Sequence, residues 1–403
     1  MILSVEPINL SSGYERDGCV CLRPQSASAT TSVERAIMEF RSARSVVIDG
    51  AEGSVLAVGV EDLDEAMSTE IETIAGGRAH LVLPAARLRR LGLEREVPGR
   101  VALPVVDRGR VEALALKVDS RIDAPVRPTD ALDGEALELA RLSLILPAVL
   151  VVPLAKGIEI DPSLVRVSGE AIRFYRRAKV AGLKIVSRAP VPLEGAPTSE
   201  FVVFRGGEGL RDQVAIIVGK PDLSKPVSVR LHSACLTGDL FGSLKCDCGD
   251  QLRDTVRFMA QNEGGILLYL DQEGRGNGIS NKIRAYKLQS QGYDTYDADE
   301  VLGFEADQRR FDFAAVMLKE LGVGKVRLMT NNPEKIAALA QAGLEVISDH
   351  RVLGRPTAEN VSYIAAKRDR AGHYIDLEGM LACSNSNQDW SSASEGSFGI
   401  GPR

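Results

Sequence analysis

Stretches rich in β-branched residues alternate with helix-like stretches along most of this chain, and this alternation limits the folds that it can adopt. The run GILLYL precedes a glycine-rich loop and the helix-like NKIRAYKLQSQG, and the run KVRLMTNN precedes a helix that begins at Pro333. This order is typical of α/β domains, whose binding sites lie at the carboxyl ends of the strands. We therefore predict an α/β fold with mixed sheets and a site at strand ends in the second half.

The length and the breaks in this pattern predict two folded domains. At about 150 residues per domain, the 403 residues fit two or three domains. The proline-rich segment VPLEGAPTS interrupts the alternation, and we place the boundary there. Both ends of the chain are rich in small polar residues without periodicity. The sequence thus predicts a flexible leader (1–31), an N-terminal domain (32–195), a C-terminal domain (196–380) and a disordered tail (381–403).

Charge and hydrophobicity exclude several classes of protein. The net charge of −6 provides no overall cationic field, so we expect no general binding to nucleic acid or to an anionic membrane. The most apolar run, residues 144–154, contains two prolines and is shorter than the roughly 18 residues of a membrane span. The amino terminus lacks the basic and apolar regions of a signal peptide. We therefore expect a cytoplasmic protein.

Three of the six cysteines, Cys235, Cys246 and Cys248, lie within fourteen residues of one another. In a reducing compartment such crowding indicates metal binding or catalysis rather than disulfides. Three thiolates can hold one Zn²⁺ and leave a position open for water, as a catalytic zinc requires. Two alternatives remain open: the thiols could be small buried hydrophobic side chains, and His232 could be a fourth ligand or a histidine paired within its strand.

The loop QEGRGNGISN lies between a predicted strand and a predicted helix. Its glycines allow close approach of the backbone to an anion, and Arg275 offers two parallel donors to phosphate oxygens. The loop lacks the Walker A pattern and is no convincing dinucleotide fingerprint, so on its own it could be an ordinary turn. In the same way, Asp307 and Arg309 could be a surface ion pair, and Tyr286 could be a packing residue of an amphipathic helix.

Taken together, these motifs resemble the GTP cyclohydrolase II family. The similarity runs through HSACLTGDLFGSLKCDCGDQL, DQEGRGNGISNKIRAYKLQSQGYDT, LGFEADQRRF and LMTNNPEKI, in the family's order, to about residue 376. The resemblance implies that the three cysteines hold one Zn²⁺ per subunit, that Asp307 is an acid–base group, that Arg309 is a nucleophile toward the α-phosphorus, and that Tyr286 is an active-site residue. It implies GTP contacts from Arg230, Ser233, Gln251, Glu273, Gly274, Arg275, Thr295, Thr330 and Lys335.

The resemblance also implies a reaction and a partner. GTP would be hydrolysed to 2,5-diamino-6-(5-phosphoribosylamino)pyrimidin-4-one, formate and pyrophosphate in riboflavin biosynthesis, with water activated at zinc, Mg²⁺ on the substrate triphosphate, and a homodimer as the assembly. Arg230, Arg275 and Lys335 suit the triphosphate, because each is cationic. Gln251 and Glu273 suit the polar edges of guanine.

Two positions depart from the family's pattern. Ala234 replaces a glutamate beside the first cysteine, and Arg310 stands where an acidic residue is usual. These changes alter the charge near the zinc ligands and near Arg309. Two alternatives to the GTP reaction therefore stay open: a homologue that acts on another purine nucleotide, and a non-catalytic GTP-binding regulator.

The N-terminal half resembles the fold of 3,4-dihydroxy-2-butanone 4-phosphate synthase, but the residues for its chemistry are missing. The dense acidic loop of that family is reduced here to Asp49 and Glu52. Its Gly-His-Thr element is replaced by Leu132, Asp133 and Gly134. A sugar phosphate needs clustered carboxylates to bind through Mg²⁺. We therefore predict that this domain lacks synthase activity and serves as a scaffold, a dimerisation surface or a regulator.

Overall fold

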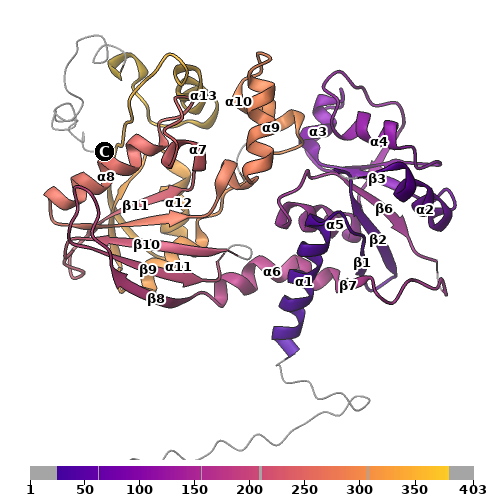
Figure 1. Cartoon of the computed structure of the whole chain (residues 1–403), viewed down its shortest axis with the longest axis horizontal. Coiled ribbons are helices and arrows are strands. Elements are labelled where there is room, and N and C mark those ends of the chain that lie inside the picture. The colour runs from indigo at the N-terminus through magenta and orange to yellow at the C-terminus, as the bar shows by residue number, and fades with distance from the viewer. Residues whose placement is uncertain (1–24, 62, 156, 208–210, 306–307, 381–403) are drawn as a thin grey trace, which may run out of the picture.

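The computed structural model describes residues 25–380 except residues 62, 156, 208–210 and 306–307. In this part of the chain, two seven-stranded sheets form the centres of two α/β units (Figure 1). The predicted α/β fold with mixed sheets is confirmed. The predicted tail and residues 1–24 of the predicted leader lie outside the described residues. No helix among the described residues is long and apolar enough to cross a membrane.

The N-terminal unit contains the first sheet, in the order β5-β4-β3-β6-β2-β1-β7. Its strands are β1 (Val46–Asp49), β2 (Ser54–Gly59), β3 (His80–Leu83), β4 (Gly99–Ala102), β5 (Val126–Pro128), β6 (Val149–Pro153) and β7 (Val165–Ser168). Its helices are α1 (Gln25–Arg41), α2 (Glu65–Ala75), α3 (Ala85–Arg90), α4 (Arg108–Ala115), α5 (Ala131–Leu142) and α6 (Gly169–Ala181). Neighbouring strands are antiparallel except β1 and β7. Helices α2, α3 and α4 cover one face, and α1, α5 and α6 cover the other.

The C-terminal unit contains the second sheet, in the order β14-β13-β11-β12-β10-β9-β8. Its strands are β8 (Lys184–Pro190), β9 (Ser199–Arg205), β10 (Asp212–Val218), β11 (Val227–Ser233), β12 (Gly265–Leu270), β13 (Lys325–Met329) and β14 (Glu345–His350). Its helices are α7 (Leu236–Asp239), α8 (Cys248–Gln261), the 3₁₀ turn η1 (Glu273–Gly276), α9 (Ile279–Gln289), α10 (Thr295–Val301), α11 (Asp312–Glu320), α12 (Pro333–Gln341) and α13 (Val361–Ala371). Strands β12, β11, β13 and β14 run parallel, whereas β8, β9 and β10 are joined antiparallel.

Two expected boundaries differ from the structure. Helix α1 begins at Gln25, inside the predicted leader. Its later residues pack on the first sheet. The first turns consist of small polar residues without an apolar period, so the sequence pattern did not predict them. Strand β8, which the sequence assigned to the N-terminal domain, pairs with β9 instead. The segment VPLEGAPTS therefore connects two strands of one sheet, and the second sheet begins at Lys184.

Helices α9 and α10 lie between the two units (Figure 1). Leu146 of the N-terminal unit belongs to one apolar cluster with residues of both helices, including Ala285 and Val301. At this junction the buried guanidinium of Arg87 donates to four carbonyl oxygens, at 2.7 Å to Leu114 and 2.9 Å to Val301 among them. Burial lowers the pKa of Arg87 to about 10. One side chain thus joins α3 and α4 to the end of α10.

We expect Arg87→Met to lower the free energy of unfolding by about 2 kcal/mol, because it leaves buried carbonyl groups without donors. Urea unfolding followed by circular dichroism measures this loss. The control is Arg90→Met on the same helix, since the Arg90 guanidinium makes a ring contact 5.6 Å from the centre of Tyr293. Equal losses in the two variants would contradict the assigned role of Arg87.

Candidate active site

The candidate site lies at the edge of the second sheet where three parallel strands end. Cys235 follows β11, Glu273 follows β12 and Thr330 follows β13. Because parallel strands present their carboxyl ends at one edge, residues that are distant in sequence meet there. The alternation of strands and helices predicted a site at this position.

The three cysteines come together at this edge. The Sγ atoms of Cys235, Cys246 and Cys248 all lie within 4.8 Å of one another, and those of Cys235 and Cys246 are 3.6 Å apart. A Cβ atom at Gly238 would lie 2.6 Å from the Sγ of Cys246, so a glycine is needed for the chain to pass so closely. Converging thiolates are the ligands that zinc prefers in proteins, so this donor set fits a zinc ion.

The electrostatic environment of the cluster favours a thiolate at Cys235. The thiols of Cys246 and Cys248 donate to Cys235 and lower its pKa, and the ammonium of Lys282, 3.1 Å from its Sγ, adds to this effect. The same interaction with Cys235 raises the pKa of Cys246 to about 11 and also raises the pKa of Cys248. The cationic neighbour of Cys235 and the partial exposure of Cys246 and Cys248 do not fit the alternative of three small hydrophobic side chains.

His232 is paired within the protein rather than with the cysteines. Its Nε2 lies 3.0 Å from Oδ2 of Asp239, and its ring stacks on that of Tyr269 with 5.5 Å between centroids. Burial lowers the pKa of His232. Asp239 also accepts from the backbone N–H of Cys235 at 2.9 Å. Among the described residues, the group of side chains placed to hold a metal contains only the three cysteines.

Glu273 is held by three donors. Its carboxylate accepts from the backbone N–H of Leu236 at 2.6 Å and from that of Gly274 at 2.8 Å, and from Nζ of Lys282 at 2.8 Å. Lys282 therefore bridges Glu273 and Cys235. Burial disfavours the charge on Lys282, but the thiolate and the carboxylate outweigh burial and raise its pKa.

Sequence reasoning missed Lys282, although a signal was present. Lys282 lies four residues before Tyr286, and residues with this spacing share one face of a helix. The hydroxyl of Tyr286 lies 3.5 Å from Oγ1 of Thr237, next to the cysteine cluster. Burial raises the pKa of Tyr286.

Two of the expected GTP contacts form a buried chain of hydrogen bonds. Arg230 donates to Oε1 of Gln251 at 2.5 Å and to the carbonyl of Met329 at 3.2 Å. Gln251 in turn donates to Oδ2 of Asp247 at 2.6 Å. Burial lowers the pKa of Arg230 to about 10, and its Nε has no hydrogen-bond partner. The hydroxyl of Ser233, three residues further, lies 3.5 Å from Oε1 of the Gln272 side chain.

The glycine-rich loop turns through two consecutive left-handed residues, Gly274 at φ 59° and Arg275 at φ 58°. Left-handed backbone is uncommon for a residue other than glycine, which marks Arg275 as a position held by its surroundings. Its guanidinium donates to Asp299 at 2.8 Å and lies 4.4 Å from the centre of the Tyr296 ring. Thr295, another expected GTP contact, is the residue before Tyr296 at the start of α10.

Two of the remaining expected residues, Lys335 and Arg309, lie near Phe311. Lys335 donates to the carbonyl of Leu231 at 2.6 Å, and its Nζ lies 5.3 Å from the centre of the Phe311 ring. The guanidinium of Arg309 lies 5.7 Å from the same centre. The hydroxyl of Thr330 accepts a hydrogen bond from the backbone N–H of Asn332 at 3.0 Å. Asp307, the predicted acid–base residue, lies outside the described residues.

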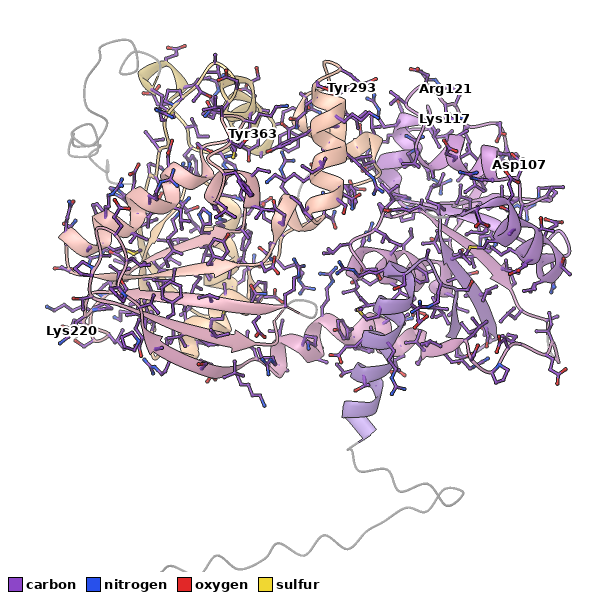
Figure 2. All side chains as sticks on the ribbon, viewed as in Figure 1. Asp107, Lys117, Arg121, Lys220, Tyr293 and Tyr363 are labelled. Atoms are coloured by element: carbon purple, nitrogen blue, oxygen red, sulfur yellow. The ribbon has the colours of Figure 1, made fainter. Side chains whose placement is uncertain are left out.

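A segment near the end of the described chain braces the cysteine loop, and sequence reasoning missed it. Lys367 of α13 donates to Oδ1 of Asp247, which lies between two of the cysteines, at 3.0 Å. The same ammonium lies 4.1 Å from the centre of the ring of Tyr363, labelled in Figure 2. Thr357 donates to the carbonyl of Leu244 at 2.8 Å. Burial disfavours charge on Asp247, but Lys367 outweighs it and lowers the pKa of this carboxyl.

In the N-terminal unit, Asp49, one of the two acidic residues left in the loop, and Asp133 of the replaced Gly-His-Thr element each pair within the protein. Asp49 accepts from Ser54 at 2.6 Å and forms an ion pair with Arg166. Asp133 is fully buried, and its Oδ1 lies 2.7 Å from Nε2 of His80. These carboxylates are engaged separately rather than gathered at one site.

Comparisons of the sequence with known proteins agree on the family. The sequence profile described as GTP cyclohydrolase II matches residues 184–351. The chain is 42% identical to a GTP cyclohydrolase-2 of Xylella fastidiosa (strain Temecula1) over 93% of this chain and 94% of that protein. It is 38% identical to a GTP cyclohydrolase-2 of Azospirillum brasilense over 87% and 95% of the two chains.

One solved structure aligns with 80% of this chain and 99% of its own chain. It is a two-domain 3,4-dihydroxy-2-butanone 4-phosphate synthase from A. baumannii, with 15% sequence identity and a TM-score of 0.30. The identities above extend over nearly the full length of both chains. The chain therefore belongs to the GTP cyclohydrolase II family of riboflavin-biosynthesis enzymes.

Proposed function

We propose that this enzyme is a zinc-dependent GTP cyclohydrolase II that hydrolyses GTP to 2,5-diamino-6-(5-phosphoribosylamino)pyrimidin-4-one, formate and pyrophosphate. The observation that carries the proposal is the convergence of Cys235, Cys246 and Cys248 at a strand edge that also gathers cationic side chains. Thiolates and cations at one edge suit a substrate that carries a purine at one end and a triphosphate at the other.

The three cysteines would hold the zinc ion, which supplies a Lewis acid and an acidic bound water at neutral pH. The protein's own residues set the geometry around it. Glu273, which Lys282 contacts, fixes the backbone beside Cys235 through its bond to Leu236 and the glycine-rich loop through its bond to Gly274. Tyr286 lies on the same helix face as Lys282, and we assign it a position beside the guanine base of GTP.

The phosphate end of the substrate is assigned to the cations of the site. Arg275 and Lys335 are held by neighbouring groups, so little side-chain entropy is lost when they bind phosphate with Mg²⁺. We assign Arg309 to the α-phosphate because it shares the Phe311 ring with Lys335. Arg230 and Gln251 would support the site from the protein interior. For either side chain to contact GTP directly, the hydrogen bond between them would have to break.

The test is incubation of the purified protein with GTP and Mg²⁺, with formate, pyrophosphate and the mass of the pyrimidine product measured. We expect all three products from GTP, and loss of pyrophosphate release without Mg²⁺. A panel of other purine triphosphates tests the alternative substrate. GTP binding by calorimetry without formate from zinc-loaded protein would replace this proposal with that of a GTP-binding regulator.

We propose further that the N-terminal unit has no dihydroxybutanone phosphate synthase activity and that the chain forms a homodimer. The separate pairing of Asp49 and Asp133 supports the first point. The relatives from Xylella fastidiosa and Azospirillum brasilense, which match along both units, carry the name GTP cyclohydrolase-2 alone. Incubation with ribulose 5-phosphate and Mg²⁺ should release no formate, and light scattering after gel filtration measures the assembly.

A further inference from the structure

Helix α9 contacts the cysteine cluster with one face and the N-terminal unit with another. Lys282 lies 3.1 Å from the Sγ of Cys235, and Tyr286 follows it on the same face. Asn281 and Arg284 project from a different part of the helix and bind groups of the N-terminal unit. A movement of this helix against the N-terminal unit therefore also moves groups of the candidate site.

A continuous polar network joins the two units at this helix. Glu61 of the N-terminal unit accepts two bonds from Arg284, at 2.8 and 2.7 Å. Arg284 also donates to Oδ1 of Asn281 at 2.7 Å. Asn281 is buried, with 1% of the residue exposed. Its Nδ2 donates to the carbonyl of Leu144 at 3.0 Å and to the carbonyl of Asn277 at 2.9 Å. One amide thus ties the N-terminal unit to the end of the glycine-rich loop.

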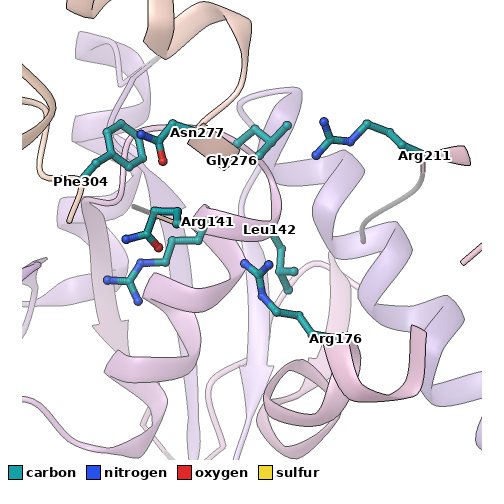
Figure 3. A pocket seen from close by; sticks show the side chains of 9 residues that line it. Arg141, Leu142, Arg176, Arg211, Gly276, Asn277 and Phe304 are labelled. Atoms are coloured by element: carbon teal, nitrogen blue, oxygen red, sulfur yellow. The ribbon is translucent and has the colours of Figure 1, made fainter. Parts of the chain in front are cut away.

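The glycine-rich loop itself packs against the N-terminal unit. A Cβ atom at Gly278 would lie 3.1 Å from the Cβ of Leu144, and both residues have left-handed backbone, at φ 87° and φ 57°. Gly276 and Asn277 line a pocket together with Arg141 of α5 (Figure 3). The loop that carries Glu273, Gly274 and Arg275 is thus bounded on one side by the N-terminal unit.

An apolar contact reinforces the polar one. Leu146, two residues after Leu144, is 1% exposed and packs in one cluster with Ala285 and Leu288 of α9. Its backbone N–H donates to the Glu61 carboxylate that binds Arg284. The same turn of the N-terminal unit therefore contacts α9 by side-chain packing, by a carbonyl and through Glu61.

We infer that Glu61, Arg284 and Asn281 form a positioning network through which the N-terminal unit fixes the orientation of α9 and the glycine-rich loop for catalysis. The inference rests on the proposed function and assigns the N-terminal unit a role in it. Glu61 and Arg284 act through Asn281 rather than on GTP. Because small displacements of catalytic groups cost up to about 10²-fold in rate, loosening this network lowers turnover while the zinc ligands stay in place.

The test compares Glu61→Gln with a matched control. Glu200→Gln removes the carboxylate of another two-bond arginine–glutamate pair, which Arg188 forms at 2.8 and 2.7 Å on strands β8 and β9. We expect Glu61→Gln to lower kcat per folded, zinc-loaded molecule by about 10-fold, with a smaller change in KM. Hydrogen exchange in the free protein should rise in residues 273–286, and the zinc content should stay that of wild type. Glu200→Gln should change none of these.

Arg284→Lys keeps the charge but loses the two-bond geometry, and it provides a second variant if Glu61→Gln fails to fold. It should give the same changes with smaller size. Wild-type kcat and wild-type exchange in both variants would overturn the inference. If the wild-type protein releases no formate from GTP, the proposed function fails, whereas exchange in residues 273–286 still decides whether the network holds α9.

Discussion

Cys246→Ser should remove bound zinc and lower formate release from GTP by about 10³-fold or more. Two thiolates and a hydroxyl form a weaker donor set than three thiolates, because a serine hydroxyl stays protonated at neutral pH. Without zinc, the attacking water keeps a pKa near that of bulk water rather than about 7. Metal analysis of the purified protein and formate release measured on the same sample check both parts of the prediction.

The control for this experiment is Cys383→Ser, which makes the same chemical change outside the described residues. It should retain the zinc content and activity of wild type. Circular dichroism spectra of both variants establish that they are folded. A folded Cys246→Ser protein that still releases formate at the wild-type rate would show that the cysteine cluster is not the catalytic centre.

The sequence predicted the parts of the site that are encoded locally. The spacing of Cys246 and Cys248 and the glycines of the loop are short-range patterns that reflect turn geometry. The position at strand ends follows from the alternation of strands and helices. The helix that begins at Pro333 is also a local signal, and the structure confirms it.

The contacts that brace the site are long-range, and no local pattern encodes them. Lys367 contacts a carboxylate 120 positions earlier in the chain, and Asn281 contacts a carbonyl 137 positions earlier. In the sequence, Lys367 cannot be distinguished from a solvent-exposed lysine, because its partner Asp247 is close to it only in the folded chain. Sequence reasoning therefore found the cysteines but not the groups that hold them.

The misplaced domain boundary has a similar physical cause. A segment rich in proline and glycine marks a reversal of the chain, and the same residues serve a hairpin and an interdomain linker. Between β8 and β9 they form a hairpin, with a short bridge between Leu193 and Ala196. The pairing of the flanking strands, rather than the composition of the segment, distinguishes a hairpin from an interdomain linker.

Lys367→Met should destabilise the protein and weaken its hold on zinc. The ammonium and its partner Asp247 are mostly buried, with 16% and 4% of their side chains exposed. Removing one member of a buried ion pair leaves the other charge uncompensated, at a cost of about 3 kcal/mol or more. Because Asp247 lies between two of the cysteines that we propose hold zinc, its displacement should lower zinc affinity by about 10-fold or more. Urea unfolding and competition with a chromogenic chelator measure the two effects.

The double variant Lys367→Met with Asp247→Asn separates the charge from the packing. With no lone charge left buried, it should lose less stability than the sum of the two single variants. Arg370→Met on the same helix is the control, since Arg370 pairs with Asp294 and Asp297 at a half-exposed site and should change stability by less than about 1 kcal/mol. Additive losses in the double variant, together with wild-type zinc affinity in Lys367→Met, would mean that α13 packs beside the cysteine loop without supporting it.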